Sequence, residues 1–324
     1  TQVFKATSSG LFLYFSDSFQ GAIMDLYSRT LFSGNYCTAQ TDKFSFELKQ
    51  LKDKLEEADA ILIGAGAGLS TAAGLTYSGK RFEKNFADFK NTFHITDMYS
   101  GGFYSFPDLE TYWAWWSRHI WINRYEPGPT SLYRNLLQIV KDRNYFVLTT
   151  NVDHQFQLAG FDKNRLFYTQ GDYGLFQCSK PCTQETYNNE ALVRSMVEQQ
   201  TNMRIPTALI PHCPHCGAPL TTNLRVDNSF VEDKSWHEAQ NRYRSFVSSN
   251  KNKRILFLEL GVGGNTPVII KYPFWQMTLD NPQATYASIN LGESFSPRTL
   301  ESQSILINAD IQKVLLHLLA VESN

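Results

Sequence analysis

The sequence predicts an α/β protein whose main part is a doubly wound parallel sheet, with a smaller lobe attached. Three observations predict this class. Short apolar runs alternate with helical patterns, which is typical of a parallel sheet covered on both faces. Two of the apolar runs lead directly into glycines, and two long segments interrupt the alternation. With 324 residues, the chain can also bury a large core.

The expected elements follow one another from residue 44. The segment FSFELKQLKDKLEEADA places Phe46, Leu48, Leu51 and Leu55 at helical spacing with charges between them, which predicts an amphipathic helix. AILIG is then a short buried strand, and the small residues of GAGLSTAAG form a glycine turn into a helix. TSLYRNLLQIVKDR predicts another helix, and YFVLTT predicts the next strand.

The C-terminal part repeats this pattern. RILFLELGVGG is a strand that runs into glycines, TYASIN is a further strand, and NADIQKVLLHLLA is a closing amphipathic helix. Ligands of such folds bind at the carboxyl ends of the strands. The informative residues of this chain follow those ends: the glycines after Ile63, then Asn151, Gly261 and Asn290.

Composition excludes some partners. Lys and Arg number 30 and Asp and Glu 31, so bulk charge supports neither nucleic acid nor a membrane surface as a partner. No apolar run reaches the roughly 18 residues of a membrane span, and we see no secretory leader. Four of the five cysteines form two close pairs, a pattern that favours a metal site over disulfides and predicts a cytoplasmic protein.

The cysteine pairs predict a structural zinc site. CSKPC contains Cys178 and Cys182, and CPHCG contains Cys213 and Cys216. Each pair can give two thiolates to one tetrahedral ion, and four thiolates leave no position open for catalysis. The alternative is two unrelated buried thiol pairs. Two nearby histidines of the PHCPHCG stretch are expected to be bystanders.

These patterns divide the chain. Residues 44–176 and 231–324 form the sheet lobe, with an aromatic helical insertion at about 80–129 that contains TYWAWWSRHIWINRY. Residues 177–230 form the small zinc-binding lobe of ribbon and helices. Residues 1–43 show no sustained period and are an N-terminal extension of unknown role. Aromatic segments such as 80–129 are more often core than site.

The first glycine turn is a candidate phosphate site. Gly64, Gly66 and Gly68 lie in a strand-to-helix turn, where backbone amides and a helix N-terminus can hold a pyrophosphate. The strict G-x-G-x-x-G pattern is absent, and no acidic residue ends a second strand about 20 residues later, so hydride transfer is poorly supported. The alternative is that the glycines only turn the chain.

The motifs GAGLSTAAG, TTNVD, TQG, CSKPC with CPHCG, GVGG and IN occur in this order. The order resembles the sirtuins, NAD-consuming enzymes with a Rossmann-like lobe and a small zinc lobe, and covers residues 44 to 319. The resemblance implies a catalytic role for Asn151, Asp153 and Gln170. It implies NAD contacts for Gly66, Ala67, Gly68, Ser70, Tyr77, Arg81, Thr150, Asn151, Asp153, Gln170, Gly261, Val262, Gly263, Asn290 and Asp310.

Three departures from the sirtuin pattern carry information. The usual P-D-F-R is missing after the glycine turn, and the nearest equivalents are Arg81 and Phe82. Thr150 replaces a Gln, and Gln170 replaces the general base, a His before Gly. A base must lose and regain a proton near neutral pH, which a Gln amide cannot do. The site can therefore open NAD but lacks the base for acyl transfer, which leaves ADP-ribosyl transfer.

This departure resembles the macrodomain-linked class M sirtuins, which share the Gln. That resemblance implies an NAD-dependent protein ADP-ribosyltransferase acting on a lipoylated, glycine-cleavage H-like carrier protein. The implied pathway partners are a macrodomain hydrolase and a lipoate ligase-like enzyme.

Several alternatives stay open at this stage. The chain could be a deacylase that uses another base, such as His154 or His94, or a non-catalytic module that binds NAD or ADP-ribose. Asn151 could be a helix N-cap, and Asp153 could favour a helix dipole. Gln170 could be a satisfied polar residue in an inactive relic.

Overall fold

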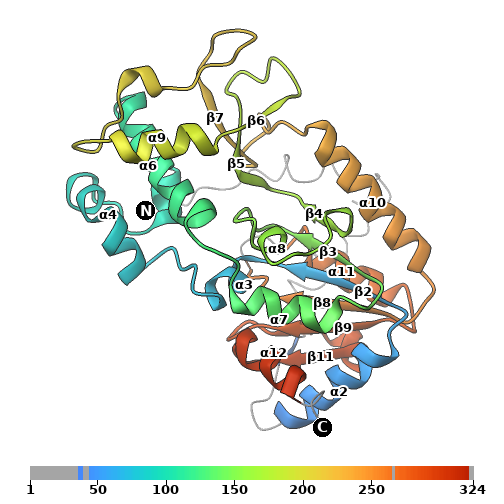
Figure 1. Cartoon of the computed structure of the whole chain (residues 1–324). Helices are drawn as coiled ribbons and strands as arrows, with labels where there is room; N and C mark the ends of the chain where they lie inside the picture. The colour runs from blue at the N-terminus through green and yellow to red at the C-terminus, as the bar shows by residue number, and fades with distance from the viewer. Residues whose placement is uncertain (1–35, 39–43, 265–266, 321–324) are drawn as a thin grey trace.

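A six-stranded parallel sheet organises the larger lobe of the protein (Figure 1). The computed structural model describes residues 36–38, 44–264 and 267–320. In spatial order the strands are β11 (Ser304–Ile307), β9 (Thr285–Ile289), β8 (Ile255–Leu260), β2 (Ala60–Ala65), β3 (Tyr145–Thr149) and β4 (Leu166–Tyr168). All three central strands are fully buried, as expected for a sheet covered on both faces.

Alternate side chains of each strand enter two separate cores. Ile61 and Ile63 of β2 face one core, while Leu62 faces the other. The first core is closed by α2 (Phe44–Glu57), α3 (Ala67–Ala72), α7 (Ser131–Val140), α8 (Gln155–Leu158) and α12 (Ile311–Ala320). The second is closed by α10 (Lys234–Asn250), α11 (Lys271–Leu279) and η5 (Arg298–Gln303). The doubly wound α/β sheet with a Rossmann-like arrangement is therefore confirmed.

The small lobe combines an antiparallel sheet with helices around an aromatic core. Its strands, in the order β6-β5-β7, are β6 (Thr186–Asn188), β5 (Gly171–Cys178) and β7 (Leu220–Leu224). Its helices are α4 (Lys80–Phe93), α5 (Met98–Gly102), α6 (Leu109–Ile120), η2 (Trp121–Tyr125), α9 (Glu190–Gln199) and η4 (Thr207–Leu209). Trp113, Trp115 and Phe86 are fully buried in this core together with Phe176 and Cys178.

This shared core unites the two segments that interrupt the alternation of strands and helices. The aromatic insertion at 80–129 packs with the cysteine-bearing segment and not with the large sheet. The antiparallel sheet begins at Gly171, six residues before the boundary expected at 177, because β5 turns away from the parallel sheet directly after β4.

Other elements were not expected from the sequence. They include β11, η3 (Lys163–Arg165), α10 and α11. Within the expected N-terminal extension, β1 (Tyr36–Thr38) pairs antiparallel with β10 (Phe295–Pro297). The rest of that extension, residues 1–35 and 39–43, lies outside the described residues.

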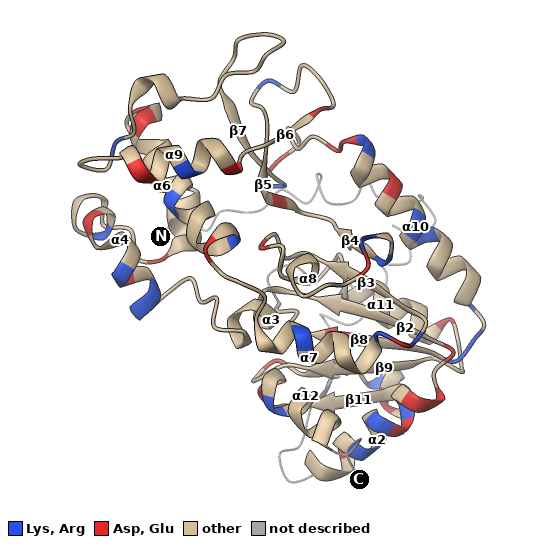
Figure 2. Ribbon diagram, viewed as in Figure 1, with Lys and Arg blue, Asp and Glu red and all other residues tan. Residues whose placement is uncertain are grey.

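Charged side chains of both signs mix on the surface helices. On the face shown in Figure 2, acidic and basic residues are interspersed along α2, α4 and α10. On α2 they form the exposed pairs Lys49–Asp53 and Lys54–Glu57. Within the described part of the chain, no helix is both long and apolar enough to cross a bilayer.

Candidate active site

Two glycine turns pack against each other at the carboxyl edge of the large sheet. The amide of Gly66 donates to Leu260 O at 3.0 Å, and that of Gly68 donates to Gly261 O at 2.9 Å. A Cβ on Gly66 would lie 2.7 Å from Gly261 O, and one on Gly68 would lie 2.7 Å from Gly261 Cα. Gly261 itself has a φ of 62°, which favours glycine. The glycines therefore permit a close approach of the turns after β2 and β8.

This packing modifies the expected phosphate site. Because the amides of Gly66 and Gly68 already donate to carbonyls of the β8 turn, they are engaged in joining the two turns. The helix that follows, α3, is only six residues long. The structural reading of these glycines thus accounts for their density, while side chains supply the polar groups of the site.

Those side chains form one hydrogen-bonded cluster from three elements. The Asn151 amide Nδ2 donates to Gly66 O at 2.9 Å and to the Tyr133 hydroxyl at 3.3 Å. Tyr133 lies 3.0 Å from Ser70 Oγ, and Ser70 Oγ donates to Asp153 Oδ2. The predicted residues Ser70, Asn151 and Asp153 are therefore brought together, and α7 adds Tyr133, which no motif of the sequence singled out.

Asp153 is a desolvated carboxyl. Its exposed fraction is 6%, and burial raises its pKa above the ordinary value, although the hydrogen bond from Ser70 opposes this. Its other oxygen accepts from the Gln155 amide at 3.1 Å, at the start of α8. One oxygen of Asp153 therefore interacts with the N-terminus of α8, as the helix-dipole alternative predicted, while the second oxygen belongs to the cluster. Asn151 caps no helix, since its amide reaches Gly66.

The other residues predicted to contact NAD each have their own interactions within the protein. The amide of Thr150 donates to Ala65 O at 3.1 Å, and Asn290 Nδ2 donates to Val262 O at 3.3 Å. Val262 is buried, whereas Gly263 packs near Glu293. Asp310 Oδ1 accepts from the amide of Lys313, so this carboxylate caps α12. Ala67 begins α3.

Gln170 lies in the turn between β4 and β5, at the junction of the two lobes. Its side chain is half-buried, and its carbonyl accepts from the Arg225 amide at 3.0 Å. No described hydrogen bond joins its amide to Asn151 or Asp153. Gln170 follows Thr169, whose amide donates to Thr149 O at 2.9 Å, so it lies at the same carboxyl edge of the sheet as the cluster.

Arg81 and Phe82 are occupied by the small lobe. The Arg81 guanidinium donates to Thr76 O at 3.0 Å, to Ile122 O at 2.6 Å and to Asn123 Oδ1 at 2.8 Å. Phe82 is fully buried in the aromatic core. In this structure Arg81 therefore holds η2 through carbonyl acceptors.

Tyr77 belongs to a buried chain of hydroxyl and imidazole groups. Its hydroxyl lies 2.6 Å from that of Tyr173, which lies 2.9 Å from His119 Nε2. Burial raises the pKa of Tyr77 to about 12 and, together with the charge of Arg81, lowers that of His119 to about 3. His119 thus stays neutral near pH 7 and is no candidate for a titrating base.

A histidine that the sequence offered only as an alternative base lies beside the cluster. His154 follows Asp153, and its Nδ1 lies 2.6 Å from Asp172 Oδ2. Asp172 also accepts from Arg124 Nε at 2.9 Å. No sequence pattern indicated this contact beyond the position of Asp172 two residues after Gln170. His94, the other alternative, is exposed at the end of α4.

Comparisons with known proteins decide the family. The chain is 36% identical over 275 residues to a protein ADP-ribosyltransferase of Staphylococcus aureus, covering 85% of this chain and 87% of the relative. It is 31% identical over 237 residues to a probable bifunctional ADP-ribose hydrolase/ADP-ribosyltransferase of Fusarium oxysporum f. sp. cubense, covering 70% of this chain but 39% of that longer protein. No family model matches.

Solved structures agree on the fold. Sir2Tm bound to a propionylated peptide superposes with a TM-score of 0.54 at 17% identity, covering 85% of this chain and 98% of that one. A complex of Sir2 with a p53 peptide and NAD⁺ gives 0.53 at 17% identity, with the same coverage. The chain belongs to the sirtuin family. It is a sirtuin-type protein ADP-ribosyltransferase, as the Staphylococcus relative is named.

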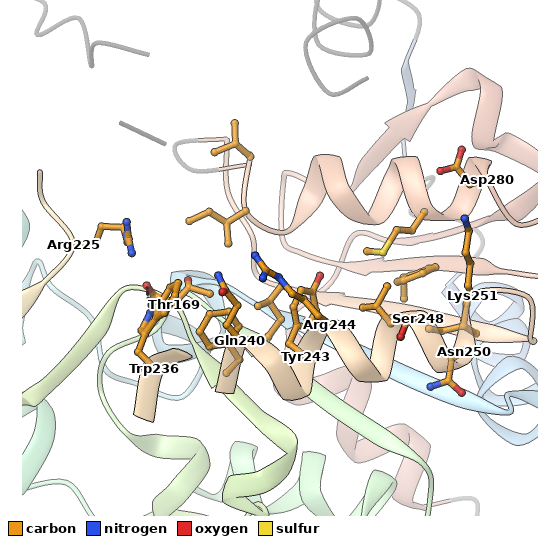
Figure 3. A pocket seen from close by; sticks show the side chains of 18 residues that line it. Thr169, Arg225, Trp236, Gln240, Tyr243, Arg244, Ser248, Asn250, Lys251 and Asp280 are labelled. Atoms are coloured by element: carbon orange, nitrogen blue, oxygen red, sulfur yellow. Dashed lines mark hydrogen bonds between the residues drawn. The ribbon is translucent and has the colours of Figure 1, made fainter. Parts of the chain in front are cut away.

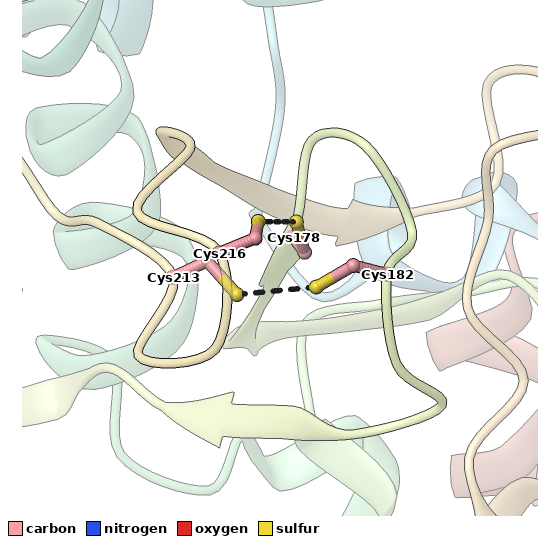
Figure 4. Close-up of side chains that lie close together, drawn as sticks. All are labelled: Cys178, Cys182, Cys213 and Cys216. Carbon is pink, nitrogen blue, oxygen red and sulfur yellow. Dashed lines mark hydrogen bonds between the residues drawn. The ribbon is translucent and has the colours of Figure 1, made fainter.

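Four of the five cysteines of this sirtuin, the two pairs of the small lobe, lie together (Figure 4). All four sulfurs lie within 4.8 Å of one another, with Cys178–Cys216 at 3.6 Å and Cys182–Cys213 at 3.5 Å. These separations are far longer than a disulfide of about 2.05 Å. They match the separation of about 3.8 Å across a tetrahedron with Zn–S bonds of about 2.3 Å.

The surroundings of the cysteines fit a structural metal. The Lys180 amide points at Cys178 Sγ at 3.4 Å. His215 is bonded to Glu185 at 2.8 Å and His212 to Ile210 O at 2.9 Å, so neither joins the sulfurs. The cluster is therefore compatible with zinc held by four thiolates, and the two histidines are bystanders as predicted.

A mostly apolar cavity of about 440 Å³ lies between α10 and the sheet of this sirtuin (Figure 3). Trp236, Tyr243 and Val247 of α10 line one wall. Thr169 and Arg225 also line the cavity. Thr169 precedes Gln170 in the chain, and the Arg225 amide donates to the backbone carbonyl of Gln170. It therefore begins next to Gln170 and runs along the face of the sheet. The sequence did not predict it, because α10 itself was not expected.

Proposed function

We propose that this sirtuin cleaves NAD, releases nicotinamide and transfers the ADP-ribose to a lipoylated, glycine-cleavage H-like carrier protein. The observation that carries the proposal is Gln170 at the same carboxyl edge of the sheet as the intact cluster of Ser70, Asn151 and Asp153. The cluster offers groups that can open NAD, whereas the Gln170 amide cannot titrate and cannot serve as the base of acyl transfer.

The cluster suits the charge that develops when the nicotinamide bond breaks. NAD supplies a ribose carbon that bears a good leaving group. Positive charge grows on that ribose, and a preorganised carboxylate and amide oxygen stabilise such charge strongly where water is excluded. Asp153 is buried and fixed by Ser70, and Asn151 is fixed by Gly66 and Tyr133. Asn290 and the turn at Gly261–Gly263 would hold the adenosine half.

The apolar cavity supports a lipoylated acceptor. A lipoyl-lysine arm is a long and mostly apolar chain with a polar amide, and the cavity volume of about 440 Å³ is of the size that holds small-molecule groups. Because the cavity begins at Thr169 and Arg225, an arm inside it would pass Gln170. Gln170 would then orient the acceptor by hydrogen bonds.

Partners and location follow as part of the same proposal. The Fusarium relative's name joins an ADP-ribose hydrolase and an ADP-ribosyltransferase in one chain, which supports a macrodomain hydrolase as the enzyme that removes the mark. A lipoate ligase-like enzyme would load the carrier. The four unbridged thiols suit a reducing cytoplasm.

The deacylase alternative has less support. His94 is exposed on α4, and the ring of His119 is buried and neutral. Nδ1 of His154 is already bonded to Asp172. A non-catalytic module would bind ligand without releasing nicotinamide.

NAD labelled on its adenylate half tests the proposal with three acceptors: the lipoylated carrier, the same carrier with a free lysine, and an acetyl-lysine peptide. We expect label to be fixed on the lipoylated carrier alone, with one nicotinamide released for each label transferred and with no deacetylation. Loss of acetyl groups without fixed label would contradict the proposal. Label on both carrier forms would remove the lipoyl requirement.

A pair of tryptophan variants tests the cavity. Val247→Trp fills it from α10, whereas Ser249→Trp adds the same bulk at an exposed position of the same helix. Carrier labelling should fall about tenfold or more in the first variant, as expected when a fitted apolar chain loses its pocket. Equal labelling by both variants would place the lipoyl arm elsewhere.

A further inference from the structure

His154 has an unusual backbone conformation directly after Asp153. Its φ of 65° lies in the left-handed region, which side-chain-bearing residues adopt rarely. A residue held in this strained conformation persists there only where the surroundings fix it. The contacts of His154 with its surroundings must therefore hold this backbone conformation.

Those contacts cross from one lobe to the other. His154 belongs to the loop between β3 and α8 of the large lobe, and its Nδ1 lies 2.6 Å from Asp172 of β5. The second oxygen of Asp172 accepts from Arg124 Nε at 2.9 Å and from the Gly174 amide at 2.7 Å. Arg124 lies on η2, a π-helical turn of a kind often found at functional sites. We call His154, Asp172 and Arg124 the inter-lobe clamp.

The central carboxylate of the clamp is buried and ionised. Asp172 is 5% exposed, and burial by itself would raise its pKa. The hydrogen bond from His154 and the charge of Arg124 outweigh burial and hold the pKa below its ordinary value. Because an ionised carboxylate only accepts hydrogen bonds, Nδ1 of His154 is the donor. Charge-assisted bonds of this kind are short and strong.

Gly174 has no side chain and so leaves space for the side chains of Asp172 and Arg124. A Cβ on Gly174 would lie 3.0 Å from Asp172 Oδ1 and 3.1 Å from Arg124 Nε, so a larger residue would press on both. A second bond, from the Tyr173 amide to Val152 O at 3.0 Å, ties the same loop to β5. The loop that carries Asp153 is therefore attached to the small lobe on both sides of that residue.

We propose that the inter-lobe clamp positions Asn151 and Asp153 for NAD cleavage by fixing their loop against the small lobe. The inference deepens the proposed function and rests on it. His154 acts here as a positioning residue through Asp153, and no bond to its ring forms or breaks. The charge of Asp172 raises the pKa of Asp153 and that of His154 lowers it, so the clamp is close enough to the cluster to act on it electrostatically.

Three variants test the clamp, with kcat and KM for nicotinamide release as the measurement. His154→Ala should lower kcat about 10- to 100-fold with little change in KM for NAD, because a misplacement near 1 Å can cost about 100-fold. His154→Asn should recover most of the rate, because Asn tolerates the left-handed region and its amide can donate to Asp172 in place of Nδ1. The control His94→Ala removes the other left-handed histidine, which is exposed, and should leave kcat unchanged.

Asp172→Ala completes a double-mutant cycle. If His154 and Asp172 act as one unit, the double variant should be no slower than either single variant. Wild-type kcat in His154→Ala would overturn the clamp. So would a His154→Asn variant that is as slow as His154→Ala at equal melting temperature, since the ring would then act chemically. Nicotinamide release without label on any acceptor would refute the proposed transfer, while these kcat ratios would still decide the clamp.

Discussion

The two lobes are stabilised in different ways. The large lobe has two apolar cores on either side of a parallel sheet, whereas the small lobe has one aromatic core and a cluster of four thiols. A parallel sheet covered on both faces supplies its own stability. The small lobe has a three-stranded sheet and a single core, and a bound metal would add to its stability. We therefore expect the site to depend on a lobe whose folding is coupled to metal binding.

The largest expected effect is the loss of the metal. Cys213→Ser should release zinc and unfold the small lobe while the large lobe keeps its own transition, since structural zinc contributes on the order of 10 kcal/mol in small domains. Metal content and two-probe thermal unfolding measure this. His215→Ser, next to the cluster but bonded to Glu185, is the matched control and should keep its zinc. Stoichiometric metal in the Cys213 variant would refute the four-thiolate site.

The large lobe is most vulnerable at one buried ion pair. Lys271 Nζ lies 2.5 Å from Glu259 Oε1, both side chains are almost completely buried, and Tyr286 donates to the second oxygen at 2.8 Å. Lys271→Met should lower the free energy of unfolding by about 3–5 kcal/mol, because it leaves a buried charge unpaired. Adding Glu259→Gln should restore most of the loss. Chemical denaturation checks both, and a single variant of wild-type stability would contradict the expectation.

A glycine pair probes the aromatic core of the small lobe. A Cβ on Gly101 would lie 2.0 Å from the Trp115 ring, whereas one on Gly102 would lie 3.5 Å from Trp116. Gly101→Ala should destabilise the small lobe by about 1–3 kcal/mol through overpacking. Gly102→Ala on the same helix should be neutral or stabilising by about 0.5 kcal/mol. Similar melting temperatures for the two variants would show that α5 does not pack as described.

The smallest effect is the loss of one surface ion pair of the large lobe at acidic pH. Asp59 Oδ1 accepts from Arg254 at 2.6 Å, and this bond lowers the pKa of Asp59 from 3.8 to about 2. A lowered pKa in the folded state gives stability that is present above pH 3.8 and is lost as the pH falls toward 2. Asp59→Asn should therefore be less stable than wild type at neutral pH, with a difference that disappears toward pH 2. A constant difference across this range would contradict the pairing.

The sequence predicted much of the large lobe, because alternating strands and helices have strong periods. Asn151, Asp153 and Ser70 could be found because polar residues after buried strands face a shared edge. The zinc cluster followed from spacing alone. α10 was missed because its face toward the sheet mixes Trp236 and Ala239 with many polar residues.

The remaining site residues depend on contacts between distant segments. Tyr133 reaches the cluster only because α7 packs beside α3, and no motif of the sequence singled it out. The Asp172 contacts require the two lobes to meet, which no local period encodes. Arg81 was predicted to bind NAD from its nearness to a missing motif, but its guanidinium faces backbone carbonyls.

We infer that the cluster at the carboxyl edge opens NAD, and nicotinamide release by the Asn151→Ala variant measures this directly. The amide of Asn151 joins the turn after β2 to Tyr133, so its loss removes the polar centre of the site while the cores stay packed. We predict a fall of about 100-fold or more in nicotinamide release, as for removal of a preorganised polar group, with unchanged melting temperature and zinc content. Release at the wild-type rate in a folded Asn151→Ala protein would contradict the claim.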